Sequence, residues 1–167
     1  RAKSGQMRKL SLSDRALLRF VRKMQDLPGQ QLFRWLDADG AAHPVTSTDV
    51  NDYIRDAMRG DFTAKHFRTW AASAIAFRAL ADAKGRISLR DVLDVVAGEL
   101  GNTPAIARKS YVHPALIELA KSGGAWDEEL KLPRTTRYLD RYERGLIAFL
   151  DRLAEAESRR KAEIGRA

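Results

Sequence analysis

The chain has 167 residues, of which 44% are hydrophobic, and this is enough for one domain with a sizeable apolar core. It contains no cysteine, which excludes both a disulfide framework and thiolate chemistry. Thirty Lys and Arg residues against 22 Asp and Glu residues give a net charge of +8, which favours a polyanionic partner.

Most of the positive charge lies in residues 1–23. Eight cationic residues stand there against Asp14 alone, which leaves +7 in this stretch, and the remainder of the chain is nearly neutral. Residues 7–12 predict a short strand, and Ser13-Asp14 supplies the start of an amphipathic helix that Pro28-Gly29 ends. The outer face of that helix carries Arg15, Arg19, Arg22 and Lys23. Such a face suits phosphate contacts, although charged faces are as common on helices that bind nothing.

A hairpin and a further helix are predicted next. Residues 32–36 and 42–45 flank Asp39-Gly40, a turn signal in which glycine tolerates a positive φ. Residues 47–49 then cap a helix that closes at Gly60. Its apolar stripe consists of Val50, Tyr53, Ile54 and Met58. These elements predict a mainly α fold with a small antiparallel β-hairpin.

A buried central helix is predicted from Thr63 to about Ala83, because this stretch is rich in alanine and large apolar residues. Arg68 lies one turn from the start of that helix, three residues after Lys65. A buried Arg68 needs an anionic partner. That partner is either a bound anion or an acidic side chain in a structural salt bridge.

The next helix is predicted to begin at Ser88 and to end abruptly at Leu100-Gly101. Its inward residues are expected to be Val92, Val95 and Leu100. Thr103-Pro104 then starts another helix, since Thr suits an N-cap and Pro suits the first helical position. The stop and restart fix a corner that carries the side-chain donor Asn102.

Tyr111 follows this corner by about two and a half helical turns and lies close to Arg108 and Lys109. Cations attract a phosphate, a helix start offers unpaired N–H groups, and a phenol can act as a nucleophile, so this stretch suits attack on a phosphodiester. The alternative is a tyrosine that is half-buried for packing alone. His113-Pro114 starts one more helix, in which His113 is either a cap or a proton relay.

The last predicted helix is amphipathic, and a charged tail over residues 155–167 is expected to fray. Its apolar residues are Leu139, Tyr142, Leu146, Phe149, Leu150 and Leu153. The sequence offers no metal-ligand spacing and no glycine-rich nucleotide motif, so we expect neither a metal nor a nucleotide cofactor. It also has no signal peptide and no apolar run of about 18 residues, so we expect a cytoplasmic protein with no membrane partner.

Two stretches together carry a family resemblance: FTAKHFRTWA at residues 62–71 and LGNTPAIARKSYVHP at residues 100–114. They resemble the catalytic core of type IB DNA topoisomerases, most closely the small bacterial and poxvirus-like enzymes. In that family a K-x-x-R step opens a long helix, and an L-G-[H/N]-T-P segment precedes the nucleophilic tyrosine by the same spacing. The resemblance implies that Arg68 and Asn102 bind the scissile phosphate and that Tyr111 is the nucleophile.

The amino-terminal residues 1–5 resemble the lysine-bearing β-hairpin of the family, which would make Lys3 the general acid. The resemblance further implies a monomer that relaxes supercoiled double-stranded DNA through a 3′-phosphotyrosyl intermediate, without ATP. Lys65, Arg108 and Lys109 would contact the DNA, together with the basic helix face.

Two departures from the family stand out. Asn102 occupies a position where many members have His, and an amide can donate a hydrogen bond but cannot act as an acid or a cation. The family also uses another catalytic arginine well upstream of the hairpin lysine, whereas here only two residues precede Lys3. We therefore expect residues 1–167 to be a single catalytic domain that lacks the amino-terminal clamp and is weakly active or inactive in isolation.

Two alternatives stay open. Tyrosine recombinases and integrases share this fold, but they usually carry His at the position of Lys65. Lys65 and the sequence TPAIARKSY, which ends at Tyr111, therefore favour a topoisomerase. The other alternative is a basic helical DNA-binding module in which Tyr111 performs no chemistry.

Overall fold

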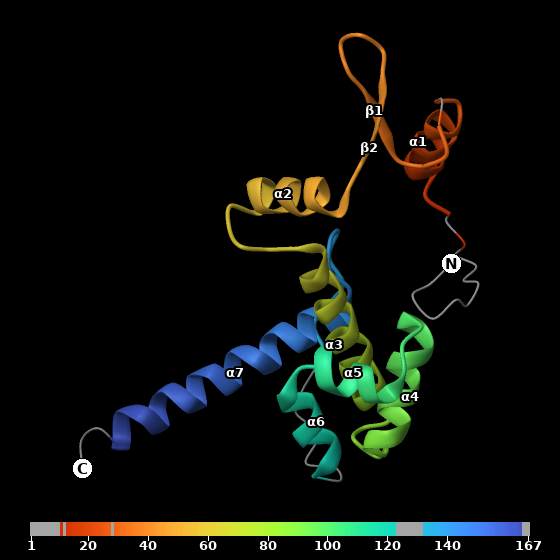
Figure 1. The fold of residues 1–167 in the computed structure, drawn as a ribbon. Coiled ribbons are helices and arrows are strands. Elements are labelled where there is room, and N and C mark those ends of the chain that lie inside the picture. The colour runs from red at the N-terminus through yellow and green to blue at the C-terminus, as the bar shows by residue number, and fades with distance from the viewer. Residues whose placement is uncertain (1–10, 12, 28, 123–131, 165–167) are drawn as a thin grey trace. The chain divides into compact units, whose positions relative to one another are not determined.

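The computed structural model describes residues 11, 13–27, 29–122 and 132–164. The chain divides into two compact units, Arg1–Thr63 and Ala64–Ala167. Helices dominate the described residues, and their one sheet is a two-stranded antiparallel hairpin (Figure 1). The predicted fold class, mainly α with a small antiparallel hairpin, is confirmed.

The first unit begins with helix α1 (Arg15–Gln25) and the hairpin of β1 (Arg34–Leu36) and β2 (Ala42–Pro44). Asp14 caps α1, because its carboxylate accepts a hydrogen bond from the Leu17 N–H at 2.7 Å. In the hairpin, Trp35 lies opposite His43, and the two rings stack at 4.7 Å. Both elements agree with their predictions, whereas the strand expected near residues 7–12 falls largely outside the described residues.

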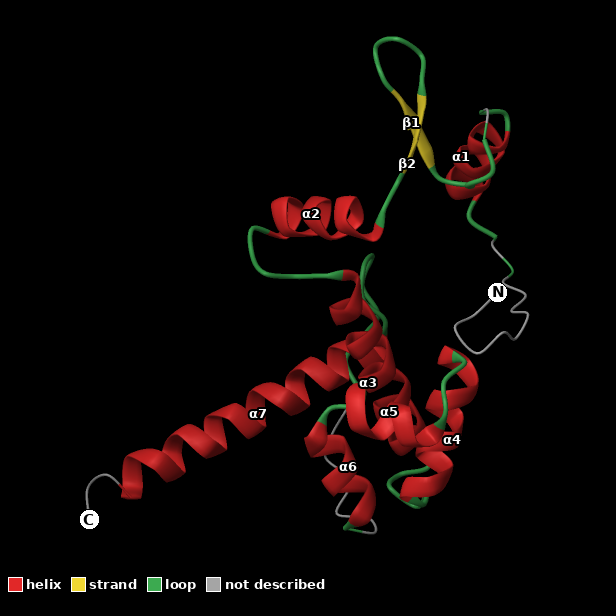
Figure 2. Ribbon diagram, viewed as in Figure 1, coloured by secondary structure: helices red, strands yellow, loops and turns green. Residues whose placement is uncertain are grey.

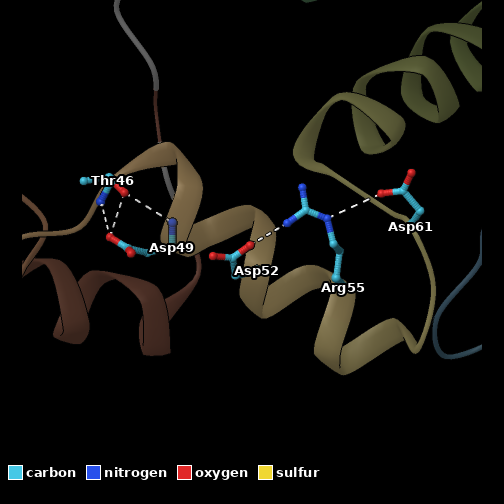
Figure 3. A network of polar contacts seen from close by, with 5 residues as sticks. All are labelled: Thr46, Asp49, Asp52, Arg55 and Asp61. Atoms are coloured by element: carbon cyan, nitrogen blue, oxygen red, sulfur yellow. Dashed lines mark hydrogen bonds and ion pairs between the residues drawn. The ribbon is translucent and has the colours of Figure 1, made fainter.

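Helix α2 (Ser47–Met58) starts from a capping box, and Figure 3 shows its polar contacts. Thr46 is the N-cap: its hydroxyl accepts from the Asp49 N–H at 3.2 Å, while the Asp49 carboxylate accepts from the Thr46 N–H at 2.7 Å. The cap therefore lies one residue before the predicted 47–49. At the other end, Arg55 binds the carboxylates of Asp52 at 2.5 Å and Asp61 at 3.4 Å.

The apolar stripe of α2 is not buried as its helical spacing suggested. Tyr53 keeps 74% of its surface exposed, Val50 and Met58 are also exposed, and no residue of α2 is buried. Helical spacing selects which residues share a face, but burial of that face requires a second apolar surface against it.

The second unit is a helical bundle of α3 (Ala64–Asp82), α4 (Leu89–Leu100), α5 (Pro104–Ser110), α6 (Pro114–Lys121) and α7 (Arg141–Ile164), as Figure 2 shows. Its core surrounds the carboxy-terminal half of α3. The largest fully buried side chains are Phe77, Leu80, Val92, Val96, Leu116 and Leu146. Four helices of this unit contribute to that set, so the central position predicted for residues 63–83 is confirmed.

Helix α4 shows one error in the predicted inward face. Val92 is buried, but Val95 is 40% exposed, and Val96 is completely buried in its place. The buried set of α4 is Val92, Leu93, Val96 and Ala97, a stripe that recurs every four residues. Residue type alone cannot tell which of two neighbouring valines is buried. The position of α3 decides that Val96 faces the core and Val95 does not.

Helix α7 packs through its first turns only. Leu146 is completely buried, and the ring of Phe149 lies 6.1 Å from that of Phe77. The helices approach closely at Gly145, where a Cβ atom would lie 2.8 Å from the Phe77 ring. The helix continues to Ile164, past the point at which we expected a fraying tail, and its far end extends away from the other helices of the unit (Figure 1). Fraying of that exposed end stays a prediction.

Candidate active site

The corner between α4 and α5 forms as its local sequence predicts. Gly101 takes the left-handed conformation (φ 61°) that ends α4, and the Asn102 N–H donates back to the Ala97 carbonyl at 3.0 Å. Thr103 then caps α5, because its hydroxyl accepts from the Ile106 N–H at 3.3 Å, and Pro104 occupies the first helical position. Asn102 is thereby held between two helix ends.

Arg68 reaches this corner from α3. Its Nη2 donates to the Leu100 carbonyl at 2.7 Å and lies 3.4 Å from the Asn102 Oδ1. The Leu100 carbonyl belongs to the last turn of α4, where carbonyls lack helical partners and carry partial negative charge. No ion pair within the described ranges involves Arg68, so the salt-bridge alternative is not found there.

Tyr111 also lies next to the Arg68 guanidinium. It forms the C-cap of α5, and the Arg68 Cζ is 5.6 Å from the centre of its half-buried ring. The predicted phosphate ligands and the predicted nucleophile, which come from three different helices or their ends, therefore meet in one cluster.

Two donors of this cluster have no acceptor among the described residues. The Arg68 Nε and the Asn102 Nδ2 are both buried without a hydrogen-bond partner. An unpaired buried donor costs about 1–3 kcal/mol, so two of them on residues in contact suit a place where an acceptor belongs. The donors come from two separate elements and lie in one cluster with a phenol, an arrangement that suits the oxygens of a phosphate diester next to a nucleophile.

The sequence did not single out Ser73, although the structure connects it to this cluster. Its hydroxyl is buried on α3 and lies within hydrogen-bond distance of the backbone at Tyr111 and His113. A polar residue inside an alanine-rich helix was the available signal, but its partners lie about 40 positions away and cannot be read from local pattern.

His113 is a cap, as one of its two predicted readings had it. Its Nδ1 accepts a hydrogen bond from the Ala115 N–H at 3.2 Å and so begins α6. Trp70, two residues after Arg68, donates from its indole Nε1 to the Glu143 carboxylate at 3.0 Å and ties α3 to the start of α7.

The predicted DNA-binding cations are exposed wherever the structure describes them. Arg108 and Lys109 line an open groove between α5 and α6, with the ion pair of Lys121 and Glu118 at its edge. Lys65 is exposed on the first turn of α3. The cations of the α1 face, Arg15, Arg19, Arg22 and Lys23, are exposed within the first unit. Phosphate contact by these residues stays a prediction, and Lys3 lies outside the described residues.

The described residues also bear on metal binding and on membrane insertion. No group of three or more His, Asp or Glu side chains in residues 11, 13–27, 29–122 and 132–164 could hold a metal ion. Within the same ranges, every helix is too short or too polar to cross a membrane.

Known proteins similar to this chain are DNA topoisomerases. The family described as "Eukaryotic DNA topoisomerase I, catalytic core" matches residues 5–121, a range that contains Arg68, Asn102 and Tyr111 and ends before α7. The chain is also similar to "DNA topoisomerase 1B" of Acanthamoeba polyphaga mimivirus, with 27% identity over 133 residues. That similarity covers 71% of this chain and 40% of the viral protein, so the chain spans less than half of the length of this relative.

Proposed function

The chain belongs to the DNA topoisomerase I catalytic-core family, and from this premise we propose that it carries the strand-cleaving centre of a type IB DNA topoisomerase. The observation that supports the proposal most directly is the pair of unpartnered buried donors, Arg68 Nε and Asn102 Nδ2, in the cluster that holds the Tyr111 ring. The family match does not favour the alternative of a non-catalytic DNA-binding module.

In the proposed reaction, the Tyr111 hydroxyl gives its proton to solvent water, and its oxygen attacks the phosphorus of one DNA strand. The bond from phosphorus to the 5′-oxygen breaks, and the strand is left joined to the protein by a 3′-phosphotyrosyl link. The free 5′ end can rotate and relieve supercoiling before it attacks the link and reseals the strand. The link conserves the energy of the phosphodiester, so the cycle needs no ATP.

Arg68 and Asn102 would hold the non-bridging oxygens as negative charge shifts onto them. The Arg68 Nη2 is already held by the Leu100 carbonyl, which restrains the guanidinium, while its buried Nε has no partner among the described residues. Preorganised donors of this kind contribute about 10²–10³ each to the rate. Asn102 supplies position and a hydrogen bond but no charge.

Lys3 would donate the proton that the leaving 5′-oxygen needs. The partner would be double-stranded DNA, which Lys65, Arg108, Lys109 and the α1 face would hold by its phosphates. We further propose that the protein acts as a monomer in the compartment that holds its DNA, the cytoplasm in our expectation.

The test is covalent capture on a DNA duplex whose cleaved end diffuses away, so that resealing is prevented. The intact protein should form an adduct that mass spectrometry maps to Tyr111. Tyr111→Phe should abolish the adduct and keep the dissociation constant for DNA within a few fold, because only the nucleophilic oxygen is lost.

Tyr138→Phe provides the matched control, since it removes the same atom from a residue that is 80% exposed and lies outside the cluster. An adduct that survives Tyr111→Phe would remove Tyr111 from the mechanism. Relaxation of supercoiled DNA without exchange of strands between sites would separate the topoisomerase from a recombinase.

A further inference from the structure

We propose that Ser73 is a positioning residue that fixes the backbone of Tyr111 relative to Arg68, so that the phenol meets the phosphate that Arg68 holds. The inference rests on the proposed function, because it gives Ser73 a part in the cleavage step and none in DNA affinity.

The hydroxyl of Ser73 binds the chain on both sides of Val112. Ser73 keeps only 4% of its surface exposed. Its oxygen accepts a hydrogen bond from the His113 N–H at 3.1 Å, and its O–H donates toward the Tyr111 carbonyl at 3.5 Å. One buried side chain therefore holds both peptide groups that enclose the residue after the nucleophile.

The other restraints on this short connection come from the helices that it joins and from the core. It runs from Tyr111 to His113, between the end of α5 and the start of α6. On its amino-terminal side, the N–H groups of Tyr111 and Val112 donate to the Ala107 carbonyl at 3.1 and 3.0 Å. On the carboxy-terminal side, Val112 is buried in the core and the His113 carbonyl accepts from the Leu116 N–H at 3.0 Å, but only the Ser73 hydroxyl ties the Tyr111 carbonyl and the His113 N–H to α3 among the described residues.

A serine inside a helix can instead satisfy its hydroxyl within its own helix, and α3 contains such a case for comparison. Thr69 donates from its hydroxyl to the Lys65 carbonyl at 3.2 Å, one turn back on the same helix. Ser73 is buried one turn later, and both of its hydroxyl contacts cross to another segment. A hydrogen bond to a carbonyl one turn back on α3 would have satisfied a buried Ser73 hydroxyl, so burial alone does not require the contacts with the Tyr111 segment.

Ser73 and Arg68 share one helix, and this turns the contact into a distance constraint. Five residues of α-helix span about 7.5 Å along the axis, and α3 between them is packed into the core at Ala72. The guanidinium and the Tyr111 backbone are therefore fixed to the same rigid segment. A displacement of about 1 Å in such an arrangement can lower a rate by about 10².

The experiment is Ser73→Ala in the intact protein, measured by single-turnover formation of the Tyr111 adduct. Alanine suits the helix interior, so α3 should persist. We expect the cleavage rate to fall by about 10- to 100-fold, while the dissociation constant for DNA changes by less than about threefold. A substrate whose 5′-leaving atom is sulfur should not restore the rate, since the defect lies in the approach of the nucleophile and not in protonation of the leaving group.

Two further variants separate positioning from general stability. Ser73→Thr keeps the hydroxyl and should recover most of the rate. Ser122→Ala makes the same chemical change in the same unit, at a hydroxyl that donates to the Leu119 carbonyl of its own helix at 2.8 Å, and should cleave like the parent. The thermal midpoint of every variant is measured, and rates are taken well below the lowest of these midpoints. If the bulkier threonine disturbs folding, the midpoint reveals it, and the alanine and sulfur results decide.

The inference is overturned if Ser73→Ala cleaves within about threefold of the parent, if Ser122→Ala shows an equal defect, or if the sulfur substrate rescues Ser73→Ala. It is also overturned if DNA affinity falls as much as the cleavage rate. Absence of any Tyr111 adduct from the full-length parent enzyme is a different outcome, because it refutes the proposed function before a Ser73 variant is made.

Discussion

The cluster of Arg68, Asn102 and Tyr111 and the basic face of α1 both present cations suited to a polyanion, but they are built differently. In the cluster, Arg68 is fixed by the Leu100 carbonyl and lies over the Tyr111 ring, and the underlying helices share an apolar core. On α1, every cation of the face is exposed, and no residue of the helix is buried.

The two regions therefore differ in how selectively each can recognise a bound anion. A fixed guanidinium with an unpaired Nε selects the geometry of an acceptor, and its loss should change a rate. Mobile exposed cations attract any polyanion within about 10 Å at ordinary salt, and their loss should change affinity and its salt dependence. Variants of Lys3, of Arg68 and of the α1 face test this division.

The largest effect is expected for Lys3→Ala. This variant is also the most severe test of the division, because Lys3 lies in the basic amino-terminal stretch but is assigned the role of general acid. Loss of a general acid should lower the cleavage rate by about 10²–10⁴ on an ordinary substrate. A substrate with sulfur as the 5′-leaving atom should restore most of that rate, since sulfur leaves readily without a proton. The measurement is the single-turnover rate on both substrates, with Arg68→Ala as the comparison that sulfur should not rescue to the same degree. Equal failure of both variants would reduce Lys3 to another phosphate contact.

Arg68→Lys should have the next largest effect, a slowing of cleavage by about 10²–10³ although the charge is kept. A lysine has one nitrogen, and the Leu100 carbonyl at the end of α4 would compete with the phosphate for it. DNA affinity should change little. Single-turnover cleavage and a binding isotherm measured on the same duplex test both statements. A variant that cleaves at the parent rate would show that Arg68 is structural. Lys65→Ala supplies the contrast, since Lys65 is exposed and its loss should be milder.

Local chemistry predicted the corner of the site, and tertiary packing decided the rest. The residue types of Gly101, Thr103 and Pro104 determine the local backbone conformation or capping at these positions. The end of α4 and the start of α5 could therefore be predicted from sequence. The roles of Arg68 and Asn102 were inferred from motif resemblance, and the structure then showed their side chains together. Their functions stay predictions.

Other features depended on partners far along the chain. The contact from Trp70 to Glu143 and the bonds of Ser73 join residues 38–73 positions apart, which no periodicity reports. The exposed stripe of α2 shows the opposite case, in which an amphipathic spacing was present but no described partner covers it.

Reversal of the α1 face should alter affinity and leave the chemistry of bound DNA intact. The variant changes Arg15, Arg19, Arg22 and Lys23 to Glu. Each phosphate contact that is lost should flatten the slope of log affinity against log salt by about 0.9. The control reverses three cations on the exposed end of α7, Arg159, Arg160 and Lys161, which lie beyond the family match. If the salt slope is the same for the parent and the α1 variant, the α1 face makes no phosphate contacts and is only a solvated surface.

The smallest effect is expected at the hairpin of the first unit. Polar contacts hold this hairpin, whereas an apolar core holds the second unit. The Asp37 carboxylate lies 2.6 Å from the His43 Nε2 and accepts from the Ala41 N–H at 2.8 Å. The hydrogen bond from His43, together with that from Ala41, lowers the pKa of Asp37 below its ordinary value. A lowered folded-state pKa adds stability that is present above the unfolded value of about 3.9 and is lost as the pH falls through the folded value.

Acid should therefore open the hairpin before it disturbs the core of α3. Hydrogen exchange at the Ala41 amide should accelerate as the pH is lowered below about 4, after correction for the intrinsic rate, while the Phe77 amide stays protected. Asp37→Asn should remove this acid-dependent step, because the neutral amide cannot lose a charge on protonation. Asp39→Asn in the same loop should keep it, since the Asp37 carboxylate and the His43 ring remain in place. Equal acid sensitivity at Ala41 and Phe77 would mean that both regions depend on the same interactions, and the contrast between a polar hairpin and an apolar core would have to be abandoned.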